Sequence, residues 1–423
     1  MKLSRQLILL LAILSFSACQ KEGGPDTDTP TGYESLQSKS EKRGVAFNFS
    51  QLPDIDIPNL GPACSWSYNW GVNVSAEASS LFAQYGMDYC PMAWNANWNE
   101  DTFRAFKKAH PECKYLLAYN EPNLTDQANM VPAKAAEDWG RLVAIARELD
   151  LKLIAPAMNY GTLEGYHDPW KWYDEFFAIE GVSWDDVDGI ALHCYMGSAG
   201  GVKQFLDGFK KYGKPLWLTE FCNWSSNNVS ADAQMKYMVE TINMLEADPD
   251  VFRYAWFIPR GHGESQCHNS LLGSKSPFAL TDLGKVFVNM STQDKSLWYK
   301  AGTVIPAEHY NSCTGAIHLA PTDDSVGVLS LTDLKKDTAV DYQIEIPEDA
   351  TYTLTLRFST YFETALRVSL DGSSLGLADL PNTDYKWDIF KVDLPLSKGR
   401  HTLSLSGTTA FPVSLNYLSI NKL

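Results

Sequence analysis

Eight short apolar runs recur through the first two thirds of the chain, and segments of helix length separate most of them. Each run has the four to eight residues that are typical of a strand buried on both faces. Strands that alternate with helices predict a parallel sheet, and eight such units over about 250 residues predict a closed (β/α)8 TIM barrel. The runs are residues 44–49, 64–70, 88–94, 114–121, 151–157, 188–195, 215–221 and 252–257.

Three of the intervals carry helix signals of their own. Asn99 precedes an acidic pair and an apolar pattern, residues 132–149 keep apolar side chains at helical spacing, and Ser230 precedes another helical stretch. Polar side chains that accept backbone N–H groups favour helix starts. These intervals therefore support the barrel interpretation.

Beyond residue 298 the pattern changes to short segments of alternating apolar and polar residues, separated by turn signals such as Asp371-Gly372. Such segments are typical of an antiparallel β-sandwich. The chain of 423 residues is also too long for a barrel alone. We therefore predict an α/β protein with a (β/α)8 barrel over residues 44–297, followed by an all-β, jelly-roll-like sandwich over residues 304–423.

The N-terminal segment, residues 1–19, has the features of a targeting signal. Lys2 and Arg5 precede a short apolar stretch, and small residues lead to Cys19. This resembles a bacterial lipoprotein signal in which Cys19 receives the lipid; the alternative is an ordinary signal peptide cut near Ala18. Residues 20–43 are rich in small and polar residues and are expected to form a flexible tether. We expect an extracytoplasmic protein, lipid-anchored to a bacterial membrane, at the outer membrane or cell surface.

The bulk composition bears on the partner. The net charge of −16 argues against nucleic acid, which would call for a basic surface. Aromatic residues make up 12% of the chain, and amphipathic rings are well suited to sugar faces or protein partners. A neutral substrate therefore fits better than a polyanion.

Seven cysteines remain when Cys19 is set aside, so they cannot all pair within one chain. We predict a disulfide between Cys222 and Cys267, which lie in predicted loops on one face. No CxxC pair is present, which argues against a zinc cluster. Four cysteines lie at apolar runs and are expected to be buried like small hydrophobic side chains: Cys64, Cys90, Cys113 and Cys194.

Two of the apolar runs end in a glutamate. KYLLAYNEP, at residues 114–122, places Glu121 at the end of the fourth run, and PLWLTEF, at residues 215–221, places Glu220 at the end of the seventh. Parallel barrel strands all end on one face, so both carboxylates are expected in one cleft. Glycoside hydrolysis needs such a pair, one to protonate the leaving oxygen and one to attack the anomeric carbon. We expect the pKa of one of them to be raised, so that it serves as the acid.

Five motifs in order resemble glycoside hydrolase family 128 (GH128), whose members are β-1,3-glucanases with a clan A barrel. The resemblance covers roughly residues 43–290. NEP and TEF alone indicate the clan, whereas the five motifs together indicate the family. They are YNW at 68–70, PMAW at 91–94, NEP at 120–122, HCY at 193–195 and TEF at 219–221.

The resemblance implies a role for five residues. Glu121 would be the general acid/base and Glu220 the nucleophile of a retaining hydrolase. Asn120 would contact the sugar 2-hydroxyl beside the nucleophile. His193 and Tyr195 would orient Glu220 or contact the sugar at the cleavage point.

Tryptophans near strand ends are expected to form the sugar-binding platform. Trp70, Trp94 and Trp256 end or nearly end a strand on the catalytic face, and Trp98 and Trp224 lie in adjoining loops. Core packing is the alternative for each of them.

The sandwich resembles a family 6 carbohydrate-binding module in four short stretches, at residues 306–310, 340–342, 399–403 and 416–420. The resemblance implies a sugar site that contains Trp387 and Tyr361, and it allows a structural calcium at Glu308. Ser414 stands where the family has a late asparagine. A purely structural sandwich is therefore the alternative.

Together these features predict a retaining, endo-acting hydrolase of laminarin-type β-1,3-glucan. Two alternatives stay open: a clan A hydrolase of another β-linked polysaccharide, and a non-catalytic, surface glycan-binding lipoprotein. The expected partners are β-glucan polysaccharide or oligosaccharide and, through the lipid anchor only, a membrane. We expect a monomer with no cofactor and no metal at the catalytic site.

Overall fold

The computed structural model describes residues 15–16, 37–224, 228–261 and 267–423. The chain forms two compact units, one made of residues 37–293 and one that contains residues 294–423. The predicted lipidation site, Cys19, lies outside the described residues. Within the described part of the chain, no helix has both the length and the apolar character that crossing a bilayer requires.

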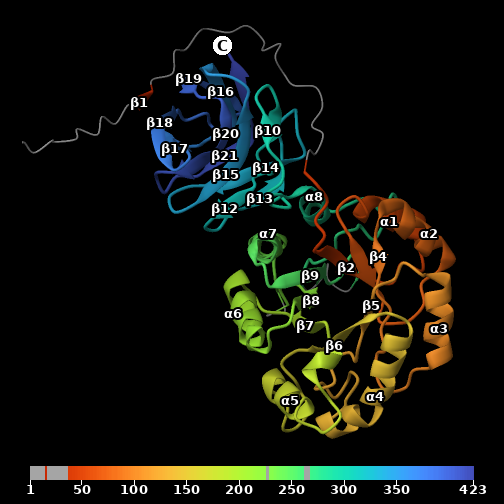
Figure 1. Cartoon of the computed structure of the whole chain (residues 1–423). Coiled ribbons are helices and arrows are strands. Elements are labelled where there is room, and N and C mark those ends of the chain that lie inside the picture. Colours follow the sequence, from red (N-terminus) through yellow and green to blue (C-terminus); the bar gives the residue numbers. More distant parts are fainter. Residues whose placement is uncertain (1–14, 17–36, 225–227, 262–266) are drawn as a thin grey trace, which may run out of the picture. The chain divides into compact units, whose positions relative to one another are not determined.

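The unit of residues 37–293 is a parallel β-barrel with helices around it (Figure 1). Its strands follow chain order around the sheet, and Met92, just after β4, closes the barrel by a parallel bridge to Leu117 of β5. The predicted parallel barrel is confirmed, and each predicted run overlaps one strand. The strands are β2 (Arg43–Ala46), β3 (Trp66–Tyr68), β4 (Asp88–Tyr89), β5 (Tyr115–Leu117), β6 (Lys152–Met158), β7 (Gly189–Cys194), β8 (Leu216–Phe221) and β9 (Val251–Trp256).

The helices of this unit begin at side-chain caps in most cases. Asn99 accepts a hydrogen bond from the backbone N–H of Thr102, and Ser230 accepts one from Ala233, so both predicted helix starts are confirmed. The helices are α1 (Pro53–Leu60), α2 (Ala76–Tyr85), α3 (Glu100–Ala109), α4 (Pro132–Glu148), α5 (Pro169–Phe176), α6 (Ala199–Phe209), α7 (Ala231–Ala247) and α8 (Asp282–Asn289), with short 3-10 turns at Trp184–Asp186 and Lys210–Tyr212.

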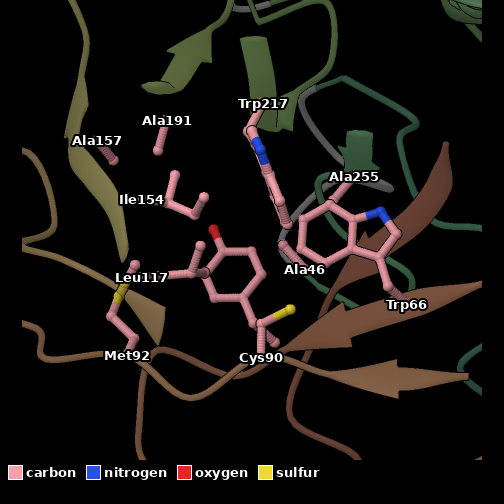
Figure 2. Close-up of a cluster of buried hydrophobic side chains, with 11 residues drawn as sticks. Ala46, Trp66, Cys90, Met92, Leu117, Ile154, Ala157, Ala191, Trp217 and Ala255 are labelled. Carbon is pink, nitrogen blue, oxygen red and sulfur yellow. The ribbon is translucent and has the colours of Figure 1, made fainter. Parts of the chain in front are cut away.

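Two tryptophans fill much of the barrel interior (Figure 2). Trp66 and Trp217 meet edge to face with ring centroids 5.4 Å apart. Glycines on neighbouring strands leave room for them: a Cβ atom at Gly44 would lie 2.6 Å from Cδ1 of Trp66, and one at Gly189 would lie 2.7 Å from Nε1 of Trp217. The interior is therefore a packed core, and a substrate can be accommodated only at its rim.

The cysteines differ in one respect from the prediction. All seven cysteines in the described part of the chain are free, so the predicted disulfide between Cys222 and Cys267 is not formed. Both side chains are buried, and the sulfur of Cys222 accepts a hydrogen bond from Nδ2 of Asn269 at 3.6 Å. The four cysteines predicted to be buried are indeed buried, and burial raises the pKa of the Cys64 thiol to about 12.

The second unit is an all-β domain of two mainly antiparallel sheets. One sheet has the order β1-β18-β17-β20-β15-β10, with β12 also paired to β15; the other has the order β13-β14-β21-β16-β19, with β11 also paired to β21. Alternate residues of the long strands are buried, as the sequence pattern predicted. The strands are β1 (Ser15–Phe16), β10 (Tyr299–Lys300), β11 (Val304–Pro306), β12 (Ser312–Thr314), β13 (Leu319–Pro321), β14 (Leu329–Leu334), β15 (Ala339–Ile346), β16 (Ala350–Ser359), β17 (Thr364–Leu370), β18 (Ser373–Leu380), β19 (Asp388–Leu396), β20 (Gly399–Gly407) and β21 (Val413–Lys422).

The two residues of the predicted sugar site in this domain, Tyr361 and Trp387, have different surroundings. Tyr361 stacks on Tyr385 with ring centroids 4.7 Å apart, and 43% and 67% of their surfaces are exposed. Trp387 instead donates a hydrogen bond to Oδ1 of Asp323, at 2.7 Å. Glu308 is buried, and burial raises its pKa to about 8. Among the described residues, no group of three or more His, Cys, Asp or Glu side chains could hold a metal.

Candidate active site

A cleft of about 640 Å³ opens where the barrel strands end. No lysine or arginine is among the described residues that line it, which suits an uncharged ligand. Aromatic rings and uncharged amides share the lining with two carboxylates. The lining residues are Trp70, Trp94, Asn120, Glu121, Leu124, Gln127, Asn159, Tyr195, Glu220, Trp224, Phe257 and Ile258.

The backbone turns sharply where it delivers Glu121 to the cleft. Asn120 still forms a parallel bridge to Ala157, and the N–H of Glu121 donates to the carbonyl of Ala157 at 3.0 Å. Glu121 then adopts a left-handed backbone conformation with φ of 46°, and Trp70 does so with φ of 61°. Such conformations cost bulky residues about 1–3 kcal/mol each and are concentrated at functional sites.

His193 lies between the two glutamates. Its Nδ1 atom is 2.9 Å from Oε1 of Glu121 and 3.3 Å from Oε2 of Glu220. Because both distances share one nitrogen, the two carboxylate oxygens are no more than 6.2 Å apart. The imidazole is fully buried. The fourth and seventh barrel strands, β5 and β8, therefore bring both carboxylates to one point, as the sequence predicted.

Three side chains hold the carboxylate of Glu220. Tyr68 donates to Oε1 at 2.8 Å, the indole of Trp70 donates to the same oxygen at 2.7 Å, and Tyr195 donates to Oε2. Burial and the charge of Glu220 raise the pKa of both phenols well above its ordinary range, so they remain donors. Glu220 is therefore held in one orientation with its charge solvated by protein donors.

The electrostatics of Glu121 differ from the expectation of a raised pKa. Burial tends to raise the pKa of Glu121, but the imidazole of His193 and the amide of Asn159, which donates to Oε1 at 3.2 Å, lower it below its ordinary value. Burial would lower the pKa of His193, but the carboxylates of Glu220 and Glu121 outweigh this effect and raise it. The charged forms of Glu121 and His193 therefore stabilise each other.

This charge arrangement predicts a pH-dependent effect of replacing His193 by glutamine. The His193 contribution to stability is complete below the ordinary histidine pKa of 6.5 and is lost as the pH rises through the raised value in the folded state. The Glu121 contribution is complete above 4.5 and is lost as the pH falls through its lowered value. The difference in unfolding free energy between wild type and His193→Gln should therefore be largest between about pH 4.5 and 6.5.

Denaturant unfolding at pH values from 3 to 9 measures this difference. Asn129→Ala, an exposed substitution of a residue without an ionisable side chain in the loop after Glu121, is the control and should show a constant difference from wild type. A His193→Gln difference that does not vary with pH would show that His193 carries no charge in the folded protein.

Trp256 was expected in the cleft, and this prediction is wrong. Its side chain is fully buried, donates to the carbonyl of Asn269 at 2.8 Å and packs edge-on against Phe221. Side chains alternate along a strand, so Ala255 faces the barrel core, Trp256 faces outward, and Phe257 reaches the cleft.

Trp98 also lies outside the described cleft lining. Its indole N–H donates to Asp138 at 2.6 Å, and the guanidinium of Arg141 stacks over its ring at 4.0 Å. This tryptophan packs the loop before α3 onto α4, and its contact with sugar stays a prediction. The structure does place Trp70, Trp94 and Trp224 in the cleft.

Sequence reasoning missed several lining and supporting residues. Asn159 follows β6 as Glu121 follows β5, so a polar residue after an apolar run was an available signal. Tyr68 lies within the quoted YNW motif but was not singled out. Gln127 and Phe257 carried no such signal. The conformation of its loop brings Gln127 to the cleft, and the register of β9 brings Phe257 there.

Comparisons with known proteins agree with this geometry. The family model described as the glycosyl hydrolase catalytic core matches residues 44–287, which is more than half of the chain. Alkali-sensitive linkage protein 1 of Schizosaccharomyces pombe is 26% identical over 266 residues, a match that spans 60% of this chain and 45% of that protein. The chain thus spans less than half the length of that relative.

Two crystal structures of GH128 subgroup II endo-β-1,3-glucanases resemble the barrel. The enzyme from Pseudomonas viridiflava is 39% identical with a TM-score of 0.54, and the match covers 60% of this chain and 98% of that one. The enzyme from Sorangium cellulosum is 32% identical with a TM-score of 0.51, covering 59% and 98%. The family predicted from the five motifs is confirmed. The chain is a glycoside hydrolase that belongs to the glycosyl hydrolase catalytic core family, with GH128 enzymes among its relatives.

Proposed function

We propose that the chain is a retaining, endo-acting β-1,3-glucanase. The observation that carries the proposal is the pair of carboxylates, Glu121 and Glu220, whose nearest oxygens lie within 6.2 Å of each other around His193. Retaining glycosidases have carboxyl groups about 5–5.5 Å apart, whereas inverting enzymes need about 6.5–9.5 Å to admit a water. The similarity to two endo-β-1,3-glucanases supports the linkage and the endo action.

In the first step Glu220 attacks the anomeric carbon and forms a glycosyl ester, while the bond to the leaving oxygen breaks. The leaving oxygen takes a proton from Glu121. His193, whose Nδ1 atom lies 2.9 Å from Oε1 of Glu121, and Asn159, which donates to the same oxygen at 3.2 Å, hold the Glu121 carboxyl in place for this transfer.

In the second step Glu121, now ionised, takes a proton from water, and the resulting hydroxide attacks the anomeric carbon from the opposite face. The ester to Glu220 breaks, and the product keeps its original configuration. Asn120 contacts the sugar 2-hydroxyl, and Trp70, Trp94 and Trp224 provide rings for sugar faces.

Release of reducing sugar from laminarin, compared with xylan, mannan and cellulose, tests the proposal. We expect hydrolysis of laminarin with a retained anomer in the first product, which proton NMR detects. If the protein cleaves only another polysaccharide, the proposed mechanism with two carboxylates stands, but the proposed β-1,3 linkage of the substrate is wrong. Binding of laminarin without any hydrolysis would instead indicate a surface glycan-binding protein.

We also propose that the C-terminal domain is a jelly-roll carbohydrate-binding module. Three loops place exposed rings near one another, Tyr361 and Phe362 from the β16–β17 loop, Tyr385 from the β18–β19 loop and Phe411 from the β20–β21 loop. Exposed rings of this kind bind sugar faces. The resemblance in four short stretches supports the same assignment.

Combined Tyr361→Ala and Tyr385→Ala substitution is expected to weaken binding to insoluble β-1,3-glucan about tenfold, since aromatic contacts contribute about 0.5–1.5 kcal/mol each. A pull-down with curdlan particles measures the binding. Hydrolysis of soluble laminari-oligosaccharides should be unchanged. Unaltered curdlan binding by the double variant would favour a structural role for the domain.

For localisation, we propose an extracytoplasmic, lipid-anchored monomer. The basic, apolar and small-residue pattern that leads to Cys19 supports the anchor. Labelling with a radioactive fatty acid in a bacterial host, with Cys19→Ala as the unlabelled control, tests it.

A further inference from the structure

Asn120 presents an unusual hydrogen-bonding state beside the two carboxylates. It is 97% buried, and its Oδ1 atom has no hydrogen-bond partner among the described residues. Its Nδ2 atom donates to Oε1 of Gln127 at 3.1 Å. A buried amide oxygen without a partner costs about 1–3 kcal/mol. It is therefore an acceptor prepared for a donor that arrives with the ligand.

Gln127 is held in place by its own loop. The backbone N–H of Ala128 donates to the carbonyl of Asn120 at 3.1 Å, and the N–H of Gln127 donates to the carbonyl of Leu124 at 3.3 Å. Met130 donates to the carbonyl of Pro122 at 2.8 Å. The loop after β5 is thus folded back onto the residues that carry the catalytic glutamate, and both amides line the cleft.

We propose that Gln127 is a positioning residue for Asn120 and, through it, selects substrates with a free 2-hydroxyl on the sugar that is cleaved. The inference rests on the proposed function. An acceptor at position 127 favours the Asn120 rotamer in which nitrogen faces the loop. The oxygen then faces the ligand and accepts from a hydroxyl donor. Without that acceptor the side-chain amide of Asn120 can rotate by about 180°, which places its NH2 group toward the ligand. The sugar hydroxyl, as a donor, would then face another donor and could not form the hydrogen bond.

The test compares two aryl β-laminaribiosides that differ only in the 2-hydroxyl of the sugar bearing the aryl group. Wild type should prefer the hydroxylated substrate about 100-fold in kcat/KM, because contacts to this hydroxyl strengthen at the transition state. In Gln127→Leu the preference should fall to about tenfold or less, mostly through loss of kcat on the hydroxylated substrate. In Gln127→Glu, which keeps an acceptor, the preference should remain near the wild-type value.

Asp126→Ala is the matched control, since this neighbouring side chain is exposed and lies outside the described cleft lining. It should keep the full preference, and unfolding midpoints of all variants establish that they fold. Each preference is the ratio of two kcat/KM values measured on the same variant. An effect of altered charge or stability that changes both values equally therefore cancels.

Two outcomes would overturn the inference: a wild-type preference in Gln127→Leu, or equal loss of preference in Gln127→Leu and Gln127→Glu. The wild-type rate on the hydroxylated substrate is a separate measurement. If wild type cleaves neither this substrate nor laminarin, the proposed function fails; if it cleaves both and the variants do not differ, only the role of Gln127 fails.

Discussion

Glu220→Ala is expected to lower kcat for laminarin at least about 10⁴-fold, because removal of a covalent nucleophile eliminates the main reaction path. Added azide should partly restore the cleavage of an aryl β-laminaribioside by attacking from the face that Glu220 leaves empty. A single displacement by azide inverts the anomeric centre, so the product should be an α-glycosyl azide. Proton NMR of the product gives its configuration.

Glu220→Gln provides the control for folding, since it keeps the shape that Tyr68, Trp70 and Tyr195 contact. It should be as inactive as Glu220→Ala but closer to wild type in its unfolding midpoint, because fewer buried donors lose a partner. Rescue of Glu220→Ala with a retained product would mean that Glu220 is not the nucleophile.

Glu121→Ala is expected to lower kcat/KM for laminarin about 10²–10⁴-fold through loss of general acid catalysis. The loss should be much smaller for a dinitrophenyl glycoside, whose leaving group needs no proton. Azide should then accelerate the breakdown of the ester to Glu220 and yield a β-glycosyl azide, with retained configuration. Steady-state rates on the two substrates, with and without azide, measure these effects.

The substrate dependence separates a chemical role of Glu121 from a structural one. A misfolded or badly packed cleft would lose activity on both substrates to the same extent. Equal losses on laminarin and on the dinitrophenyl glycoside, with no effect of azide, would therefore exclude Glu121 as the acid/base.

Much of the fold and part of the site were predictable from local patterns. Short apolar runs separated by helix-length segments predict a parallel barrel whatever the detailed packing. A strand of a parallel sheet is buried on both faces and is therefore apolar along its length, and a helix must connect it to the next parallel strand. Once the runs are counted, the parallel direction of the strands places Glu121 and Glu220 on the same face. Asn120 follows from its position next to Glu121.

Other features depend on strand register and loop conformation, which no local sequence pattern specifies. Trp256 and Phe257 are neighbours in sequence, but a shift of one residue in strand register decides which of them lies in the cleft. Gln127 lies in the cleft because its loop folds back on the carbonyls of Asn120 and Pro122.

The sequence by itself determined the barrel, the strand positions of the two glutamates and their pairing in one cleft, because these follow from strand order and the common direction of parallel strands. Only the tertiary structure decided how the charge of Glu121 is stabilised. That depends on His193, which comes from a third strand and lies 2.9 Å from Glu121 and 3.3 Å from Glu220. Electrostatic interactions between buried groups change steeply over such distances, and chain order does not specify them.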